Sequence, residues 1–410
     1  MEVENFSMLD GLLVALSVAI AAVLLRREVR DAPFWCATVT PLASIIGSGF
    51  LVVVPLLAGI AGTLSLFAIV GIVLLSFWLG KAIRFNILHD GRTPRVDSDP
   101  FAQPLERLSD LALAGAYVIS ITFYIRLMCG FVLTGVDAYS SFNADALATL
   151  VLLFIGIYGL RRGLHGLERL EEYSVTIKLS IIAALLAALA YYDADTGYDL
   201  SGLPLPESSL WESLRHLGGM LLIVQGFETS KYLASSYDAP LRARSMRLAQ
   251  LVAGVIYVAF VALAMPLMAP FARVAPNETA IIDLSGNITL ILPVMLVVAA
   301  SMSQFSAAIA DTIGAGGVVE NETRKRLSAR SSYAIIACLA VSLMWASNIF
   351  EIVALASRAF AFYYMLQAVL AARLAAKVST GRQRYWLLFS YSSLALLLLA
   401  IVLFALPVEA

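Results

Sequence analysis

Charged residues are scarce in this sequence. Asp, Glu, Lys and Arg make up 14% of its 410 residues and 60% are hydrophobic, whereas roughly 25% of the residues in a soluble domain are charged. Hydrophobic runs long enough to cross a bilayer recur from end to end, with only short polar stretches between them. The composition therefore predicts a multi-pass integral membrane protein, with one domain that lies entirely in the lipid bilayer.

Cysteine and histidine are equally rare, with three of each. The cysteines lie in or beside hydrophobic runs and lack metal-ligand spacing, which argues against a disulfide framework or a zinc site. The histidines are far apart in the sequence, which argues against a metal centre or a nucleophilic site that depends on histidine. The formal net charge of −1 gives no reason to expect nucleic acid as a partner, and we expect no cofactor.

Twelve hydrophobic runs are predicted to form an all-α protein of twelve transmembrane helices. They are 8–25, 36–62, 63–83, 108–135, 145–160, 172–192, 213–235, 248–270, 285–314, 331–347, 349–376 and 385–406.

Lys and Arg are concentrated in alternate connections between these runs. Only Arg215 and Arg273 lie in the intervening connections, which are acidic and contain proline. The first run follows the acidic residues MEVEN and precedes Arg26 and Arg27, a polarity opposite to that of a secretory signal. Because basic loops stay in the cytoplasm, we expect both termini outside it, most simply in a bacterial inner (plasma) membrane.

Two of the runs are interrupted by glycine at matching places. The stretch IIGSGF contains Gly47 and Gly49, and the stretch IVQGFET contains Gly226. If 36–192 and 213–377 are two repeats of five helices, each interruption falls in the first helix of its repeat. Matching interruptions are typical of transporters built as inverted repeats. The runs 8–25 and 385–406 are then extra helices at the two ends.

An unwound turn exposes main-chain polar groups at a depth where lipid cannot satisfy them. A half-helix that begins near Phe50 would direct its N–H groups at an anion such as a solute carboxylate. The alternative is that Gly-Ser-Gly is only a small-residue packing face. The residues predicted to bind solute are Ile46, Gly47, Ser48, Gly49, Phe50, Val224, Gln225, Gly226, Phe227, Glu228 and Arg126.

These stretches resemble those of secondary transporters with the LeuT-like fold, in particular the amino acid–polyamine–organocation transporters. IGSGF is similar to that family's substrate loop, and QGFET is similar to the break in its sixth core helix. AASMSQFSAAIADT, 299–312, resembles the eighth core helix of the sodium/solute symporters instead. The resemblance covers about 8–377 in topology, although its motifs are short.

The symporter resemblance implies a sodium site. Its ligands would be main-chain carbonyls near Ala43 and Ile46 together with Ala300, Ser303 and Gln304. The symporters have a second hydroxyl where this chain has Gln304. A glutamine oxygen can coordinate a hard cation, but its longer arm needs another geometry.

The resemblance also implies a role for Lys178, which lies inside the run 172–192. In some transporters of this fold a lysine at the similar place puts its ammonium where sodium would bind, and the carrier is proton-coupled or ion-independent. A lysine withdrawn from water can release its proton during a cycle. The alternative is that Lys178 extends to the cytoplasmic headgroups, about 10 Å away.

Other charges inside the runs need partners or a watery cavity. Arg126 is near the middle of its run, as is Glu228, so the two side chains could pair. Lys231 lies three residues after Glu228 and would compete for its carboxylate. Arg126 would act as a gate, as a selector of anionic solutes or as a structural tie between helices. Asp311 is expected to face solvent near a helix end.

The sequence thus predicts a secondary active transporter that moves an amino acid or a similar small organic solute by alternating access, coupled to Na⁺ or H⁺. The alternatives are a membrane sensor that binds a solute without moving it and, less favoured, a membrane-embedded enzyme. The sequence gives no basis for the oligomeric state.

Overall fold

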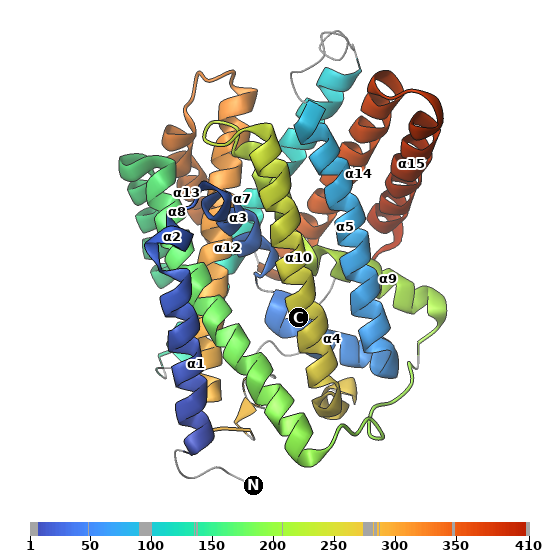
Figure 1. Cartoon of the computed structure of the whole chain (residues 1–410). Helices are drawn as coiled ribbons and strands as arrows, with labels where there is room; N and C mark the ends of the chain where they lie inside the picture. Colours follow the sequence, from blue (N-terminus) through green and yellow to red (C-terminus); the bar gives the residue numbers. More distant parts are fainter. Residues whose placement is uncertain are drawn as a thin grey trace.

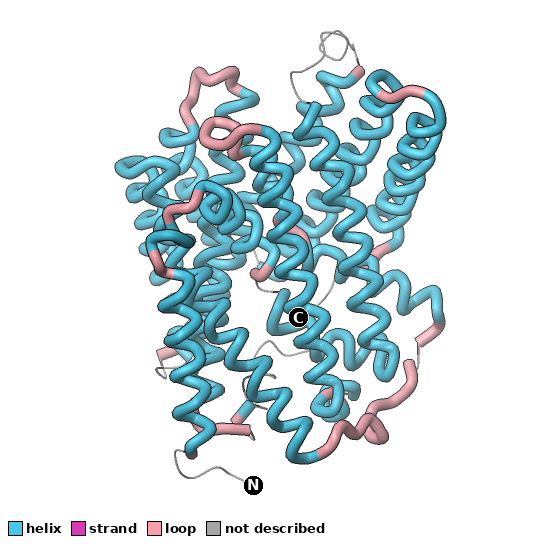
Figure 2. The backbone as a smooth tube through the Cα atoms, in the orientation of Figure 1, coloured by secondary structure: helices cyan, strands magenta, loops and turns pink. Residues whose placement is uncertain are grey.

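The computed structural model describes residues 7–47, 49–89, 101–134, 136, 138–206, 208–273, 282, 285–286, 288–346 and 349–406. This part of the chain is a bundle of helices and contains no strand (Figures 1 and 2). Eight stretches of the described helices are long and apolar enough to cross a membrane. Large hydrophobic side chains such as Phe389 and Leu396 are exposed on the bundle, as contact with lipid requires. The all-helical prediction is confirmed.

In chain order the helices are α1 (Met8–Leu24), α2 (Arg27–Arg30), α3 (Pro33–Ile45), α4 (Gly49–Ala61), η1 (Gly62–Leu64), α5 (Ser65–His89), α7 (Ala102–Thr134), α8 (Ser141–Thr196), α9 (Leu210–Met220), η2 (Leu221–Val224), η3 (Phe227–Tyr232), α10 (Ala239–Ala264), η4 (Met265–Leu267), η5 (Ala269–Arg273), α12 (Leu292–Glu322), α13 (Ala329–Ala346), α14 (Ile349–Val378) and α15 (Gly381–Phe404).

Local sequence signals fix several helix ends. Ser7 and Asp10 exchange hydrogen bonds in a capping box at the start of α1. The Asp238 carboxylate caps α10 by accepting from the main-chain N–H of Leu241, with Pro240 inside the first turn. Gly163 interrupts the long helix α8 with φ of +68°, a value that favours glycine. The predicted runs 145–160 and 172–192 are therefore two arms of α8 that meet at this kink.

Two packed groups of helices divide the bundle. Helix α12 packs against α7, α8 and α13, and α10 packs against α3 and α5. Helix α3 also contacts α12 and α8, so it lies between the groups. In Figure 1, α3, α7, α10 and α12 meet near the middle of the molecule. The polar residues of the candidate site lie at this junction.

Candidate functional site

The first predicted break is present in the structure. Helix α3 ends at Ile45 and α4 begins at Gly49. Among the described residues, no acceptor is found for the main-chain N–H groups of Gly47 and Gly49. Ser48, which was also predicted to bind solute, lies outside the described residues. The start of α4 therefore offers free N–H groups inside the protein, where an anion would satisfy them.

The second predicted break is also present. Helix α9 stops at Met220, a 3₁₀ turn follows, and Gln225 and Gly226 belong to no helix before η3 begins at Phe227. Gly226 adopts φ of +112°, a backbone conformation that L side chains rarely adopt. Its main-chain N–H donates to the Glu228 carboxylate over 3.0 Å. At the second break, unlike the first, a nearby side chain, that of Glu228, therefore accepts a hydrogen bond from an exposed main-chain N–H group.

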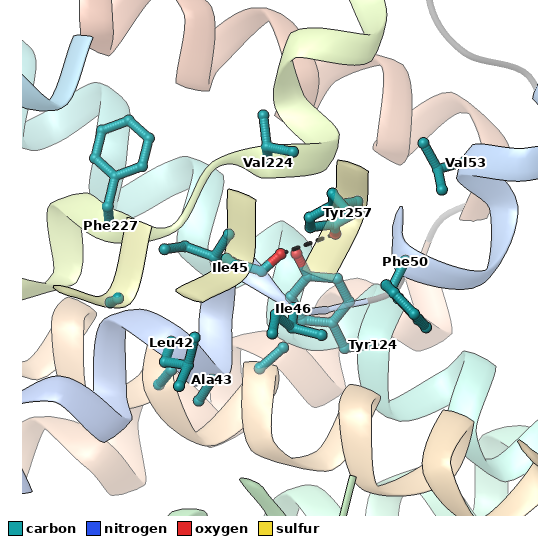
Figure 3. Packing of buried hydrophobic residues seen from close by; sticks show 14 of the residues in the cluster. Leu42, Ala43, Ile45, Ile46, Phe50, Val53, Tyr124, Val224, Phe227 and Tyr257 are labelled. Carbon is teal, nitrogen blue, oxygen red and sulfur yellow. Dashed lines mark hydrogen bonds between the residues drawn. The ribbon is translucent and has the colours of Figure 1, made fainter. Parts of the chain in front are cut away.

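The two breaks touch each other. A Cβ built on Gly226 would lie 2.3 Å from the Ser44 hydroxyl oxygen, so this contact requires glycine. The Tyr257 hydroxyl lies 3.1 Å from the carbonyl oxygen of Ile45 and 3.0 Å from that of Ile223. Figure 3 shows Tyr257 reaching the Ile45 carbonyl, with Phe50 beside it. Residues almost two hundred positions apart thus form one continuous polar junction.

Lys178 fills the place predicted for a sodium ion. Its Nζ donates to the carbonyl oxygens of Ala43 at 2.9 Å and Ile46 at 2.6 Å, and to the Ser306 hydroxyl at 2.8 Å. The side chain is fully buried, so the alternative that it extends to the headgroups is wrong. The helical arm that follows Gly163 extends about 22 Å to Lys178 at 1.5 Å per residue, farther than the about 10 Å expected from the start of the hydrophobic run.

The remaining predicted sodium ligands lie around this ammonium. The Ser303 hydroxyl donates to the Ile46 carbonyl over 2.8 Å, and Ala300 is buried one turn earlier on α12. The Gln304 side chain is buried, and its Oε1 accepts no hydrogen bond from the described residues. The Lys178 ammonium hydrogen-bonds both main-chain carbonyls that were predicted to bind sodium. In this structure the predicted sodium site therefore holds the lysine side chain. The described residues contain no cluster of His, Cys, Asp or Glu placed to hold a metal.

Glu228 is held by neutral donors. Besides the Gly226 N–H, its carboxylate accepts from the hydroxyls of Tyr117, at 3.2 Å, and Tyr364. Phe227 is buried and stacks on Tyr364 with ring centroids 5.4 Å apart. Phe227 and Glu228 therefore lie in one cluster with a tyrosine that the sequence alone did not single out as a site residue.

The pairing of Arg126 with Glu228, which the sequence left open, is not found in the structure. Arg126 Nε lies 2.7 Å from Asp145 Oδ1, because the start of α8 places that carboxylate beside α7. The Arg126 side chain also donates to Ser141 over 3.1 Å. This arginine is a tie between α7 and α8, and its ion pair involves neither break.

Lys231 does not compete for Glu228 either. Its Nζ lies 3.1 Å from Glu106 and 3.7 Å from Asp110, both on α7. Tyr232 donates to Asp110 over 2.8 Å. These contacts tie η3, which follows the second break, to α7.

Asp311 was expected to face solvent and is buried instead. Helix α12 continues to Glu322, eight residues beyond the predicted end of its run, so Asp311 lies well inside it. Its carboxylate accepts from the hydroxyls of Ser44, at 2.9 Å, and Ser120. Asp311 thus contacts the first break through Ser44, beside Gly226 of the second.

Two main-chain carbonyls of residues predicted to bind solute already have donors in the structure. The Val224 carbonyl accepts from the Ser76 hydroxyl over 3.1 Å, and the Gly226 carbonyl accepts from the Thr229 hydroxyl over 2.8 Å. The Tyr364 hydroxyl, which is close to the Glu228 carboxylate, also lies 3.1 Å from the Gln225 side-chain oxygen, and it can donate its single hydrogen to only one of the two. The acidic side chain that contacts the second break directly is Glu228.

Comparison with known proteins gives consistent results. A sequence model described as an APC superfamily transporter matches residues 27–405. A protein of Aquifex aeolicus (strain VF5) without an assigned function is 46% identical over 343 residues, which cover 82% of this chain and 83% of that one.

Two solved structures share the fold. The structure of MhsT in complex with L-phenylalanine has a TM-score of 0.55 at 16% identity, over 90% of this chain and 98% of that one. A substrate-bound, outward-open Na⁺-coupled sialic acid symporter has a TM-score of 0.52 at 13% identity, over 98% of this chain and 97% of that one. Both are LeuT-fold transporters, so the predicted fold resemblance is confirmed.

Proposed function

Because this chain belongs to the APC superfamily of transporters, we propose that it is a secondary active carrier of an amino acid or a similar small organic solute. The superfamily identifies a transporter and not an enzyme. Solute would bind between the two helix breaks and cross the membrane by alternating access.

The observation that carries this proposal is the contact between the breaks. Gly226 packs on Ser44, and Tyr257 hydrogen-bonds carbonyls of both broken segments. Main-chain groups exposed at membrane depth are tolerated where they line a binding site. The breaks also lie where the packed group of α7, α8, α12 and α13 meets that of α3, α5 and α10. A movement of one group against the other would open this site to either side.

The polar groups favour a solute that carries both a carboxylate and an amine. The N–H groups of Gly47 and Gly49, for which the described part of the chain offers no acceptor, suit the carboxylate. We propose that Ser48 and Phe50, their neighbours in the sequence, complete this part of the site. The Glu228 carboxylate suits the amine, since the carbonyls of Val224 and Gly226 are already occupied by donors. Phe227 would contact the solute side chain. Arg126, which is tied to Asp145, would hold α7 against α8 and would not be a ligand of the solute.

Lys178 supports coupling to protons. Its ammonium makes the contacts that a sodium ion would make with Ala43 and Ile46, so we propose that loss and uptake of its proton replaces sodium binding and release. Sodium coupling is the second candidate, because one structural neighbour is described as Na⁺-coupled. That candidate requires the Lys178 side chain to leave the site before Ser303 and Gln304 could contribute ligands.

The topology extends the proposal. We propose twelve crossings, arranged as two inverted repeats, 36–192 and 213–377, with extra helices at 8–25 and 385–406. The concentration of Lys and Arg in alternate connections supports termini outside the cytoplasm and a bacterial inner membrane.

A ligand screen followed by transport assays tests the function. Purified protein is heated with individual amino acids, amines and carboxylates, because a solute that binds the folded state raises the Tm. The best ligand is then assayed for counterflow in proteoliposomes, and for uptake under a pH gradient or a sodium gradient. We expect stabilisation, counterflow and a response to pH. Absence of any stabilising solute would count against the carrier, whereas binding without counterflow would identify a sensor.

A further inference from the structure

A large cavity opens at the end of the bundle that carries the basic loops, away from both helix breaks. Its volume is about 920 Å³, and its walls come from the C-terminal part of α5, the N-terminal part of α10 and the N-terminal part of α15. These three helix ends lie toward the top of Figure 1, opposite the N-terminus of the chain. The transport cycle proposed above assigns no role to this cavity.

The charged residues that line the cavity all have the same sign. They are Lys81, Arg84, Arg244, Arg247 and Arg382. None of them forms an ion pair with a carboxylate in the described part of the chain. Positive charges gathered around one cavity repel each other unless an anion lies among them. The cavity is therefore electrostatically suited to a ligand with concentrated negative charge.

Two of the cations are held in place by neighbours. Arg84 donates to the side-chain oxygen of Gln250 on α10. Gln250 packs so closely on Gly80 that a Cβ there would lie 2.1 Å from its Oε1. Lys81 Nζ lies 4.4 Å from the ring centroid of Trp386 on α15. These contacts pre-organise cations from α5 against the two other helices.

The remaining wall is aromatic and apolar. Trp386 is 59% exposed beside the buried Leu387 and Tyr391, and the ring of Tyr391 lies 5.5 Å from that of Phe85. Exposed tryptophan next to basic residues is typical of the level of the lipid headgroups. A ligand here would meet basic groups and, beside them, a surface suited to acyl chains.

We propose that this cavity binds a phosphate-bearing anion at the membrane surface. Arginine pairs well with phosphate oxygens, and basic pockets between transmembrane helices on the cytoplasmic side bind anionic headgroups. The phosphate would come from an anionic phospholipid or from a soluble phosphate compound. In both cases it bridges α5, α10 and α15.

The test compares two triple variants with equal loss of charge. The cavity variant is Arg244→Gln, Arg247→Gln and Arg382→Gln, three exposed side chains whose replacement leaves the core intact. The control variant is Arg161→Gln, Arg169→Gln and Arg326→Gln, which are exposed basic residues that do not line the cavity. Delipidated protein is titrated with phosphatidylglycerol or phosphatidylcholine of the same acyl chains, and binding is followed by native mass spectrometry and Tm.

We expect phosphatidylglycerol to raise the Tm of the wild type and to bind it more tightly than phosphatidylcholine does. The cavity variant should lose at least tenfold in affinity, since each basic residue contributes about fivefold, while the control variant should change less than twofold.

A second arm uses inorganic phosphate and glycerol 3-phosphate at constant ionic strength. If these compounds stabilise the wild type but not the cavity variant, the proposal is supported and the phosphate comes from a soluble compound. Equal behaviour of the two variants in both arms would overturn it.

Discussion

The ammonium nitrogen of Lys178 lies 2.6 Å from the main-chain carbonyl oxygen of Ile46, the last residue before the Gly-Ser-Gly turn. An ammonium has three donors, and here each finds an acceptor, on Ala43, Ile46 and Ser306. Removal of the proton would weaken the contacts that tie α8 and α12 to the broken helix. Protonation of Lys178 would in this way set how firmly the first break is held.

Replacement of Lys178 by alanine should abolish uptake driven by a pH gradient, because the exchangeable proton is lost. Counterflow without a gradient should persist, which provides the internal control for a folded solute site. Uptake of labelled solute into proteoliposomes measures both. If the Lys178→Ala variant still accumulates solute when the outside is acidified, the lysine is not the coupling group.

Gly226→Ala should destabilise the protein far more than Gly197→Ala. Both glycines have positive φ, +112° and +85°, so both substitutions strain the backbone by about 1–3 kcal/mol. Only at Gly226 would the added Cβ meet Ser44, whereas Gly197 faces open space. The difference in Tm between the two variants measures the effect of the contact between Gly226 and Ser44. Similar Tm values would mean that this contact contributes little to stability.

Asp311→Ala should lower the Tm and reduce transport, since it leaves the buried hydroxyl of Ser44 without its acceptor. A buried group left in this way costs about 1–3 kcal/mol, whereas Ser120 can still donate to the Tyr117 carbonyl oxygen. The double variant Ser44→Ala, Asp311→Ala should lose less than the sum of the two single variants. Simple additivity of the changes in Tm would show that Ser44 and Asp311 are not coupled.

Lys231→Met should be strongly destabilising, because it leaves the buried carboxylate of Asp110 without its cation. Breaking a buried pair costs about 3–5 kcal/mol. Adding Asp110→Asn should restore much of the lost Tm. The exposed pair of Arg30 and Asp31 is the control: Asp31→Asn should change the Tm little, since exposed pairs contribute about 0–1 kcal/mol. Equal changes in the two cases would refute a special role for Lys231.

Arg126→Gln and Asp145→Asn should affect transport alike, because each removes one side of the same ion pair. We expect a changed maximal rate and an unchanged half-saturating concentration of solute. Concentration series of uptake for both variants distinguish a structural tie between helices from a ligand of the solute. A weaker apparent affinity confined to Arg126→Gln would instead identify Arg126 as a selector of anionic solutes.

The sequence was sufficient to predict the breaks and the lysine. Glycine at Gly47, Gly49 and Gly226 interrupts otherwise apolar runs, and this signal is local to the chain. Lys178 was assigned by resemblance, but its depth was underestimated because the helix extends back through polar residues to the kink at Gly163. A hydropathy run reports where the apolar residues stop, and a helix can continue beyond that point.

The partners of the buried charges could not be predicted in the same way. Arg126 pairs with Asp145 and Lys231 with Glu106 because of how the helices rotate against one another, which sequence spacing does not reveal. Asp311 was misplaced because α12 runs on past the predicted end of its hydrophobic run at 314 to Glu322. Tyr117 and Tyr364 carry no signal that separates them from other aromatic residues of a hydrophobic chain.

Tyr257 has one hydroxyl hydrogen and two carbonyls within reach, Ile45 and Ile223. At any instant only one of these carbonyl oxygens accepts the hydroxyl hydrogen, and rotation of the hydroxyl transfers the hydrogen bond to the other oxygen. The Tyr257 hydroxyl therefore links the segment that ends at Ile45 to the segment that contains Ile223, and a solute that donated a hydrogen bond to one of these oxygens would leave the hydroxyl free to donate to the other.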